Sequence, residues 1–486
     1  MPATGLGRQC DRIIEGEVNP RTMRGGLDSL FKPRSVAVVG ASANPAKISN
    51  VVLRNLSMGS FRVMPVNPKE KEILGLECFP SVQSITGEVD LALIALPAEA
   101  AVRAAAECVA KGVGVVIVTS SGFAESGPAG RALQDQLEAV FEGTGTRLLG
   151  PNTMGVFVPG QRLDTLLIPA EKSPRPPQGS VAMISQSGAV AIAFLEKAER
   201  TGMGVSSCVC VGNKADIEEC ELLEHFAADG GTDCISMYLE SFSDGRRFVE
   251  AAGRVSVRKP VVVLKSGRSG AGARAASSHT GAMAASSDSL VDGALRQAGV
   301  VRAYDEEELV DLSRALAYLG HAKGDKVCVV ASAGGFGVIA SDYVESREHG
   351  FGLRMAELSD ETKERLATMV PAYSSVGNPV DLTAEVTDDM YDKVLEVLQA
   401  DPGVDCIMMS LELQPPNVTQ GLVSVAARRR SASPVPIVVS AFGGSDMRDT
   451  LASLERSRVP SYPTIHRAVR AIAALVERGR YLERQK

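Results

Sequence analysis

The stretch SVAMISQSGAV, residues 180–190, contains the structural unit from which the fold can be predicted. It begins with a short apolar run, turns through small polar residues and continues into a segment with the apolar spacing of a helix. Two other stretches have the same plan, SVAVVGASANP from Ser35 and KVCVVASAGGFG from Lys326. The three starts are almost evenly spaced, which predicts three domains of similar size, each opening with a strand, a tight turn and a helix.

Short runs rich in Val and Ile recur along the chain, and they are apolar throughout rather than alternating with polar residues. Such runs are typical of strands that are buried on both faces of a parallel sheet. Amphipathic segments of helix length lie between them, for example at 99–111 and 130–141. The alternation predicts an α/β fold with three doubly wound parallel sheets. The apolar runs lie at 35–40, 91–96, 114–119, 181–185, 260–265, 327–331 and 436–440.

Breaker-rich stretches set the expected domain boundaries. The second repeat follows PAEKSPRPPQG at 169–179, and the third follows a glycine-bounded stretch at 320–324. We therefore expect an N-terminal extension and three domains. Their residues are 1–25 for the extension, then 26–165, 176–320 and 325–486 for the domains.

Composition excludes several classes of protein. The net charge is −7, and the densest basic run is only Arg428-Arg429-Arg430, so nucleic acid is not an expected partner. No apolar stretch approaches the roughly 18 residues of a membrane span, and the N-terminus lacks the apolar region of a signal peptide. The nine cysteines are scattered, which predicts buried reduced thiols and no metal site. We expect a cytoplasmic protein without a membrane partner.

The first turn, at 40–45, is a candidate anion site, because Gly and Ser at a strand-to-helix turn let backbone N–H groups approach a phosphate. It lacks the full G-x-G-x-x-G pattern, and Asn67 stands where a dinucleotide site has Asp or Glu. Lys47 and Lys69 would suit a nucleotide with additional phosphates, such as coenzyme A (CoA). A turn required for packing, with two solvated lysines, is the alternative.

The second and third turns are less specific. Ser185-Gln186-Ser187-Gly188 carries two hydroxyls and an amide at a helix start, and both a helix cap and a phosphate cradle would explain it. The third turn, at 332–337, is rich in glycine, and packing explains it better than a ligand does.

One of the five histidines, His279, lies in an unusual place. It sits in a segment of small residues at 266–286, and a linker of about twenty residues inside a compact domain is either functional or disordered. A neutral imidazole nitrogen can attack a phosphoryl group, and a mobile loop could carry it between two places. A solvated loop histidine is the alternative.

Glu240 is the candidate partner of this histidine, because it closes the predicted strand at 233–239. The carboxyl ends of parallel strands form the active sites of α/β proteins, and a carboxylate there would orient an imidazole and stabilise its positive ring. An acidic region at a helix N-terminus is the alternative interpretation.

Together these segments resemble the α subunit of the nucleoside-diphosphate-forming acyl-CoA synthetases. This is the ADP-forming acetate–CoA ligase family, which is related to succinyl-CoA synthetase. The resemblance runs from about Leu27 to the C-terminus, and it departs at Thr153 and Phe336, where the family often has Cys and Pro. The segments that carry it are VAVVGASANPAKI, MPVNPKEKEILGLECFPSV, GPNTMG, ISQSGA, GNKADI, YLESFSDGRRF, GARAASSHTGA and NPVDL.

The resemblance implies a CoA-binding Rossmann-like domain followed by two flavodoxin-like domains, and a role for each matching residue. His279 would be the phosphohistidine, and Glu240 the carboxylate that orients and stabilises it. The implied CoA-binding positions are Gly40, Ala41, Ser42, Lys47, Asn67, Pro68, Lys69 and Pro97. The implied phosphate and active-site loops contain Asn152, Ser185, Gln186, Ser187, Gly188, Asn213 and Lys214.

The implied reaction interconverts acyl-CoA, phosphate and ADP with a small organic acid, CoA and ATP, through an acyl phosphate and a phosphohistidine. No ATP-grasp region follows residue 486, so the resemblance implies that the nucleotide and Mg²⁺ bind an ATP-grasp β chain, in a heterotetramer. Two alternatives remain: a non-catalytic regulator that binds CoA or acyl-CoA, and an NAD(P) oxidoreductase, which Asn67 disfavours.

Overall fold

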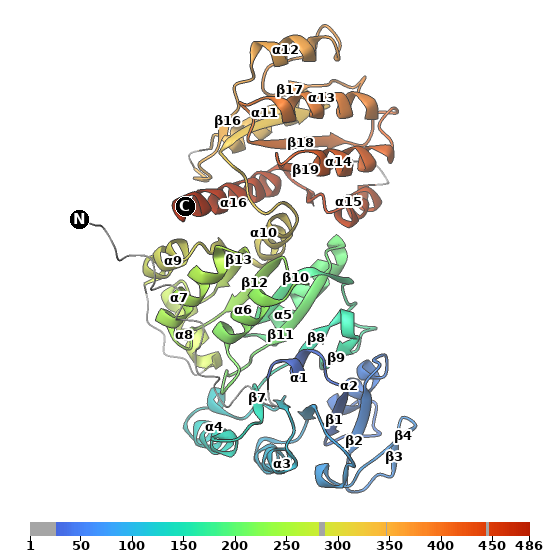
Figure 1. Cartoon of the computed structure of the whole chain (residues 1–486), viewed down its shortest axis with the longest axis vertical. Coiled ribbons are helices and arrows are strands. Elements are labelled where there is room, and N and C mark those ends of the chain that lie inside the picture. The colour runs from blue at the N-terminus through green and yellow to red at the C-terminus, as the bar shows by residue number, and fades with distance from the viewer. Residues whose placement is uncertain (1–25, 281–286, 347, 444–446) are drawn as a thin grey trace, which may run out of the picture.

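The computed structural model describes residues 26–280, 287–346, 348–443 and 447–486, without the side chains of residues 277–280. Three large sheets follow one another along the long axis of the molecule, from the N-terminal sheet at the bottom of Figure 1 to the C-terminal sheet at the top. The predicted α/β class is confirmed, and each repeated stretch of the sequence forms a strand, a turn and a helix.

The first sheet has the strand order β2-β1-β5-β6-β7, and all its strands are parallel. The chain leaves β1 toward β2 on one side and later returns to β5 on the other, so the turn after β1 lies where the winding reverses. Ligands of doubly wound sheets bind at such a position. The strands are β1 (Ser35–Val39), β2 (Arg62–Val66), β5 (Leu91–Ile94), β6 (Val115–Val118) and β7 (Arg147–Leu149), with a separate ribbon of β3 (Glu72–Ile73) and β4 (Leu76–Glu77). The helices are α1 (Asp28–Phe31), α2 (Ile48–Leu56), α3 (Ala98–Lys111) and α4 (Pro128–Phe141).

The second sheet has the order β14-β13-β12-β10-β11-β8-β9. Strands β8 and β9 are antiparallel additions at its edge, although the sequence assigned them to the first domain, 26–165. The strands are β8 (Val156–Val158), β9 (Leu163–Asp164), β10 (Gln178–Ser185), β11 (Val205–Cys210), β12 (Cys234–Leu239), β13 (Val261–Lys265) and β14 (Val301–Ala303). The helices are α5 (Gly188–Thr201), α6 (Glu219–Ala228), α7 (Gly245–Ser256), α8 (Gly270–Thr280), α9 (Asp288–Gln297) and α10 (Glu306–Leu319).

The segment at 266–286 corrects a prediction, because most of its described part is a helix rather than a loop. Helix α8 contains four alanines, the best helix formers, and these outweigh its glycines. Ser269 begins the helix: its Oγ accepts a hydrogen bond from the N–H of Gly272 at 3.0 Å, and its carbonyl accepts one from the N–H of Ala273 at 2.7 Å. Residues 281–286 lie outside the described part of the chain.

The third sheet has the order β16-β15-β18-β19-β20, and β17 also pairs with β15. Its opening strand, β15, is followed by the third repeated turn and then by α11. The strands are β15 (Lys326–Ala331), β16 (Arg354–Met355), β17 (Val380–Asp381), β18 (Cys406–Glu412), β19 (Ile437–Phe442) and β20 (Ser461–Tyr462). The helices are α11 (Gly334–Val344), α12 (Asp360–Ala367), α13 (Asp388–Ala400), α14 (Gly421–Ala432), α15 (Met447–Arg456) and α16 (Ile465–Arg484).

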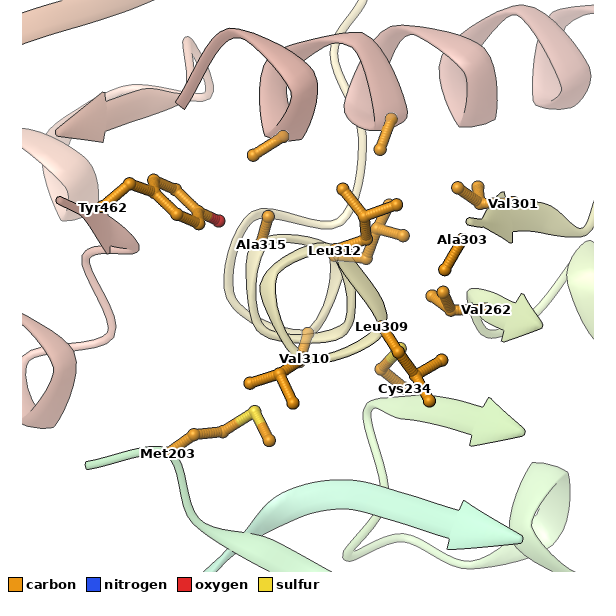
Figure 2. Close-up of a cluster of buried hydrophobic side chains, with 14 of the residues drawn as sticks. Met203, Cys234, Val262, Val301, Ala303, Leu309, Val310, Leu312, Ala315 and Tyr462 are labelled. Carbon is orange, nitrogen blue, oxygen red and sulfur yellow. The ribbon is translucent and has the colours of Figure 1, made fainter. Parts of the chain in front are cut away.

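Helix α10 joins the second and third parts of the molecule through one apolar core (Figure 2). Leu309 lies near Cys234 and Val262 of the second sheet, while Leu312 and Ala315 lie toward α16. Each of these side chains is almost fully buried. Because burial of one Leu or Val stabilises a fold by about 1.5–3 kcal/mol, this core fixes the two sheets relative to each other.

The cysteines agree with the expectation of buried thiols. The eight cysteines in the described part of the chain are all buried and unpaired. Burial raises the pKa of the Cys210 thiol to about 12, so this thiol is protonated at neutral pH. None of the described helices is both long enough and apolar enough to cross a membrane.

Candidate active site

A pocket of about 1,090 Å³ opens at the reversal point of the first sheet, beside the turn after β1. It contains every residue that the resemblance grouped as CoA-binding, and these residues come from four separate parts of the sequence. The structure therefore brings together Gly40, Ala41, Ser42, Lys47, Asn67, Pro68, Lys69 and Pro97.

Backbone bonds and one amide side chain hold the turn beside this pocket. The N–H groups of Gly40 and Ala41 both donate to the carbonyl of Val66, at 3.1 Å each. The Asn67 Nδ2 donates to the carbonyl of Ala41 at 2.7 Å, and its Oδ1 accepts from the N–H of Lys69 at 2.8 Å. Gly40 has a φ of 83°, a conformation that favours glycine. Asn67 thus joins the turn to the end of β2 and sets the position of Lys69.

The pocket has the charge and the helix end that a phosphate needs. Lys47, Lys69 and Arg103 line it, and Lys47 precedes α2 without a side-chain cap. The first N–H groups of α2 are therefore available to an anion. Arg103, Ser120 and Ser121 also line the pocket and were not predicted, although the two serines follow β6 at the same sheet edge as Pro97. Their position after a buried strand is the signal that could have identified them.

Gln186, in the turn after β10, holds the end of the neighbouring strand β12. Its Oε1 accepts from the N–H groups of Glu240 and Ser241 at 2.9 and 3.0 Å, and its Nε2 donates to the Ser241 Oγ at 3.0 Å. Its own N–H donates to the carbonyl of Tyr238 at 3.0 Å. Only 5% of Gln186 is exposed. Its amide therefore fixes the backbone of Glu240 rather than facing solvent.

The two serines of this turn leave the start of α5 open. Ser187 is the N-cap residue but makes no side-chain cap, and the Ser185 Oγ instead bonds to the backbone of Ser187, at 2.7 Å to its carbonyl. A Cβ on Gly188 would lie 2.1 Å from the Met154 Cγ, so the next position requires glycine. Of the two explanations left by the sequence, the absence of a side-chain cap favours an anion site at α5.

Glu240 lies at the carboxyl end of β12 and is 9% exposed. The Tyr238 hydroxyl lies 3.2 Å from its Oε1 and 3.2 Å from the Ser266 Oγ. Burial raises the pKa of Tyr238, which keeps this hydroxyl a proton donor. The Lys265 Nζ donates to the carbonyls of Glu240 and Ser266 at 2.7 and 2.6 Å. These bonds connect Glu240 to the segment that leads into α8.

Two loops from different sheets meet beside this site. The Asn152 Nδ2 lies 3.4 Å from the Asn213 Oδ1, and the Asn213 Nδ2 donates to Glu125 at 2.6 Å and to Gln134 at 3.0 Å. Partial burial opposes ionisation of Glu125, but hydrogen bonds from Asn213 and from backbone N–H groups lower its pKa overall. Glu125 and Gln134 were not predicted, because nothing in their local sequence pattern indicates a contact with Asn213.

Lys214, the last of the predicted loop residues, is committed to a buried ion pair. Its Nζ lies 3.0 Å from Glu219, and the side chains are 5% and 0% exposed. It also donates to the carbonyl of Ser241 at 2.9 Å. Lys214 therefore ties its loop to the residue after Glu240. Both partners of Lys214 are protein groups, so the structure gives this residue a role in holding the loop in place.

Glu219 also belongs to a trio, Glu218, Glu219 and Cys220, whose ligand atoms lie close enough to hold a metal ion. Both carboxylates have other partners, because Glu218 caps α6 and Glu219 pairs with Lys214. We therefore assign these three residues to the stabilisation of the start of α6.

The backbone of His279 lies near the end of α8, and its side chain lies outside the described part of the structure. Helix α8 contacts the 3₁₀ turn η3 (Ala124–Ser126), which carries Glu125. Ser266 lies four residues before the first residue of α8, at what we call the root of this helix. The Tyr238 hydroxyl connects Ser266 to Glu240. The helix that carries His279 thus runs between the Glu240 region and the asparagine loops.

Comparisons with known families agree with this architecture. The CoA-binding domain family matches residues 34–159, the succinyl-CoA ligase like flavodoxin domain matches 178–316, and the ligase-CoA domain matches 327–482. These three domains define the chain as a CoA ligase of the succinyl-CoA ligase class.

Known proteins resemble it over nearly its whole length. The α subunit of ADP-forming acetate–CoA ligase I from Pyrococcus furiosus is 37% identical over 470 residues, which cover 95% of this chain and 99% of that subunit. The ADP-forming acetate–CoA ligase I of Archaeoglobus fulgidus is 38% identical, and the match covers 94% of this chain but 64% of that protein. A structure of Ca. Korarchaeum cryptofilum dinucleotide forming acetyl-coenzyme A synthetase 1, in complex with phosphate and ADP, superposes with a TM-score of 0.86. It is 33% identical and covers 95% of this chain and 99% of that one.

This chain belongs to the ADP-forming acetate–CoA ligase family. The resemblance drawn from the sequence is thereby confirmed, as are the ligase class and the involvement of CoA and a nucleotide. Relatives named as α subunits imply a partner subunit. The family assignment speaks against the NAD(P) oxidoreductase alternative.

Proposed function

We propose that this chain is the α chain of a nucleoside-diphosphate-forming acyl-CoA ligase and that it acts with an ATP-grasp β chain in the cytoplasm. The observation that best supports this proposal is the position of Glu240. It is buried at the end of a strand, its backbone is held by the turn before α5, and it is linked through Tyr238 to Ser266, which precedes α8. We assign the nucleotide and Mg²⁺ to the β chain, in a heterotetramer, and a small carboxylic acid to the substrate role.

CoA occupies the pocket of the first sheet in this proposal. The nucleotide end of CoA carries several phosphate charges, and Lys47, Lys69 and Arg103 supply cations from three parts of the pocket wall. The uncapped start of α2 adds backbone donors. The volume of about 1,090 Å³ is sufficient for a large nucleotide-bearing ligand.

Three displacements account for the reaction. A phosphate oxygen attacks the thioester carbon, the carbon–sulfur bond breaks, and CoA leaves as a thiolate that takes up a proton. An imidazole nitrogen of His279 then attacks phosphorus, and the bond to the acyl oxygen breaks, which releases the carboxylate and leaves a phosphohistidine. A phosphate oxygen of ADP finally attacks that phosphorus, and the nitrogen–phosphorus bond breaks to give ATP.

The residues around Glu240 favour the second displacement. The carboxylate stabilises the positive charge that the imidazole acquires when it takes the phosphoryl group. The open N-terminus of α5, in the turn that holds Glu240, offers backbone donors to the phosphoryl oxygens. The third displacement requires His279 to reach the β chain, which we assign to movement of the segment that includes the end of α8.

Reconstitution tests this function. The purified chain alone should show negligible acyl-CoA synthesis, and addition of an ATP-grasp β chain should restore it. ATP-dependent turnover by the lone chain would contradict the assignment of the nucleotide to a partner. Tight CoA binding without any phosphorylation of the complex would instead support the alternative, a non-catalytic CoA- or acyl-CoA-binding regulator.

A further inference from the structure

A second pocket, of about 590 Å³, lies where the second and third parts of the molecule meet. Its wall is formed by α9, β14, residues 349–352 and α16. Figure 1 shows α9 below the C-terminal end of α16. It shares no lining residue with the pocket of the first sheet. Arginines dominate its lining. They are Arg296, Arg302, Arg470, Arg478, Arg480 and Arg484, and the acidic residues of the wall are Asp292, Glu308 and Glu477.

Some of these arginines have carboxylate partners. Arg302 pairs with Asp288 and with Asp292, the latter at 3.3 Å. Arg470 lies 3.2 Å from Glu477 and 3.7 Å from Glu308. The acidic residues of the wall are therefore already neutralised by neighbouring guanidinium groups.

Arg478 is different, because it is buried without a counter-charge. It is 5% exposed, and it forms no ion pair with any carboxylate of the described residues. Its Nη1 donates to the carbonyl of Ser256 at 2.7 Å, and its Nε makes no hydrogen bond. A carbonyl at the end of α7 compensates only part of the charge. A buried cation without an ionic partner is costly, and an anion in the pocket would remove that cost.

The rest of the pocket suits an anion that carries a ring. Arg484 is exposed at its wall and also lacks an ion pair among the described residues. Phe351, His349 and His466 supply aromatic surface, and the two histidine rings lie 5.1 Å apart. Aromatic faces beside guanidinium groups are suited to stacking with a base.

We propose that this pocket binds a phosphate-bearing anion, in the form of a nucleoside di- or triphosphate. Guanidinium groups match phosphate oxygens with paired hydrogen bonds, which favours phosphate over a simple halide. The volume lies in the range of small-molecule sites. The site is separate from the CoA pocket, so both ligands bind one chain at the same time.

The test uses the full chain, saturated with CoA so that the pocket of the first sheet is filled. ADP and pyrophosphate are titrated separately at low salt by calorimetry. We expect one binding event per chain for ADP. Tighter binding of ADP than of pyrophosphate shows that the aromatic wall contacts the base, and equal affinity shows that the pocket recognises phosphate alone. Failure of both probes to bind overturns the proposal.

Two variants locate the site. Arg478→Gln removes the buried charge, and Arg484→Glu reverses a charge on the exposed wall, where folding is not at risk. Each should weaken ADP binding at least tenfold. Arg365→Glu, the same charge reversal as in Arg484→Glu but at an exposed position of α12 outside the pocket, should leave ADP binding unchanged. Unaltered affinity in both pocket variants, with folding verified by circular dichroism, would refute the site.

Discussion

The second and third sheets place a glutamate at equivalent positions, yet they use it differently. Glu240 follows β12, which pairs with the opening strand β10, and Glu412 ends β18, which pairs with the opening strand β15. In the second sheet the turn holds the backbone of Glu240, through Gln186. In the third sheet the turn binds the carboxylate itself, because Glu412 accepts hydrogen bonds from the N–H and the hydroxyl of Ser332.

The two glutamates differ in which group the turn binds: the backbone N–H of Glu240, but the carboxylate of Glu412. Both carboxylate oxygens of Glu412 are engaged, since Ser410 donates to the second at 2.9 Å. Burial raises the pKa of Glu412, although the serine bonds oppose the shift. Glu240 is positioned through its backbone, and its carboxylate lies beside Tyr238 at the root of α8. The fold therefore anchors Glu240 through its backbone N–H and Glu412 through its carboxylate, and we propose that Glu240 acts in the reaction whereas Glu412 closes a turn.

The largest expected effect is the loss of the relay when His279 is changed. His279→Ala should abolish the phosphoenzyme and lower net turnover by at least about a thousandfold, because the other steps cannot pass phosphate to ADP. Labelling of the assembled complex with radioactive ATP measures this. His321→Ala, at an exposed histidine elsewhere, is the control and should label fully. Full labelling of the His279 variant would end the relay assignment.

The two glutamates provide the direct comparison. Glu240→Gln should lower the phosphoenzyme level about tenfold or more, because a lost charge-assisted contact costs about 1.5–3 kcal/mol. Glu412→Gln preserves a hydrogen-bonding side chain of the same size and should change the level less than about twofold. The measurement is the level of phosphoenzyme in each of the two variants relative to the parent chain. Equal losses would show that the two glutamates do not differ in the way we describe.

The turn of the first sheet differs from both others, because exposed lysines line the pocket beside it. The double variant Lys47→Ala and Lys69→Ala should weaken CoA binding by about tenfold, since it removes two charge-assisted contacts to phosphate. Folding should remain within about 0.5 kcal/mol of the parent chain, because exposed substitutions usually do. Calorimetry with CoA and thermal unfolding measure the two effects. Unchanged CoA affinity would return both lysines to a role in solvation.

Gln186 is the residue that creates the difference between the sheets. Gln186→Ala leaves the buried N–H groups of Glu240 and Ser241 without an acceptor, which costs about 1–3 kcal/mol of unfolding free energy. We expect a lower melting temperature and a several-fold lower phosphoenzyme level, because Glu240 is then less precisely placed. Ser332→Ala, the counterpart in the third sheet, should reduce stability without reducing phosphorylation. Normal phosphorylation in Gln186→Ala would show that Glu240 needs no such support.

The smallest effect concerns the pH dependence of stability. The raised pKa of Glu412 means that the folded protein binds a proton more tightly than the unfolded chain. Stability from this group is therefore present below the ordinary glutamate pKa and falls as pH rises through the interval up to the raised value. Glu412→Gln should flatten that part of the curve of unfolding free energy against pH. A curve with the same slope as that of the parent chain would contradict this assignment.

The secondary structure and the pocket of the first sheet could be predicted, because both follow from short sequence patterns. The three repeated stretches gave the strands, turns and helices correctly, and residues as distant as Gly40 and Pro97 line one pocket because parallel strands end at a common edge. The place of Glu240 directly after a buried strand was predicted as well, and its catalytic role stays a prediction.

The remaining features depend on contacts between distant residues. The choice of β11 as partner for β8 is not local, so the first domain was predicted to extend through two strands of the second sheet. The alanines of α8 competed with its glycines, and the prediction gave the glycines too much weight. The bonds from Asn213 to Glu125 and Gln134 join residues of different sheets, and no spacing along the chain announces them.

We propose that His279 carries the phosphoryl group and that Glu240 stabilises it there. The test is mass spectrometry of acid-labile phosphate on the complex of this chain with an ATP-grasp β chain, after incubation with ATP. We predict that in this chain phosphate maps to His279, with a level at least about tenfold lower in Glu240→Gln. Phosphate mapped to Ser277, or a level unaffected by Glu240→Gln, would contradict the account.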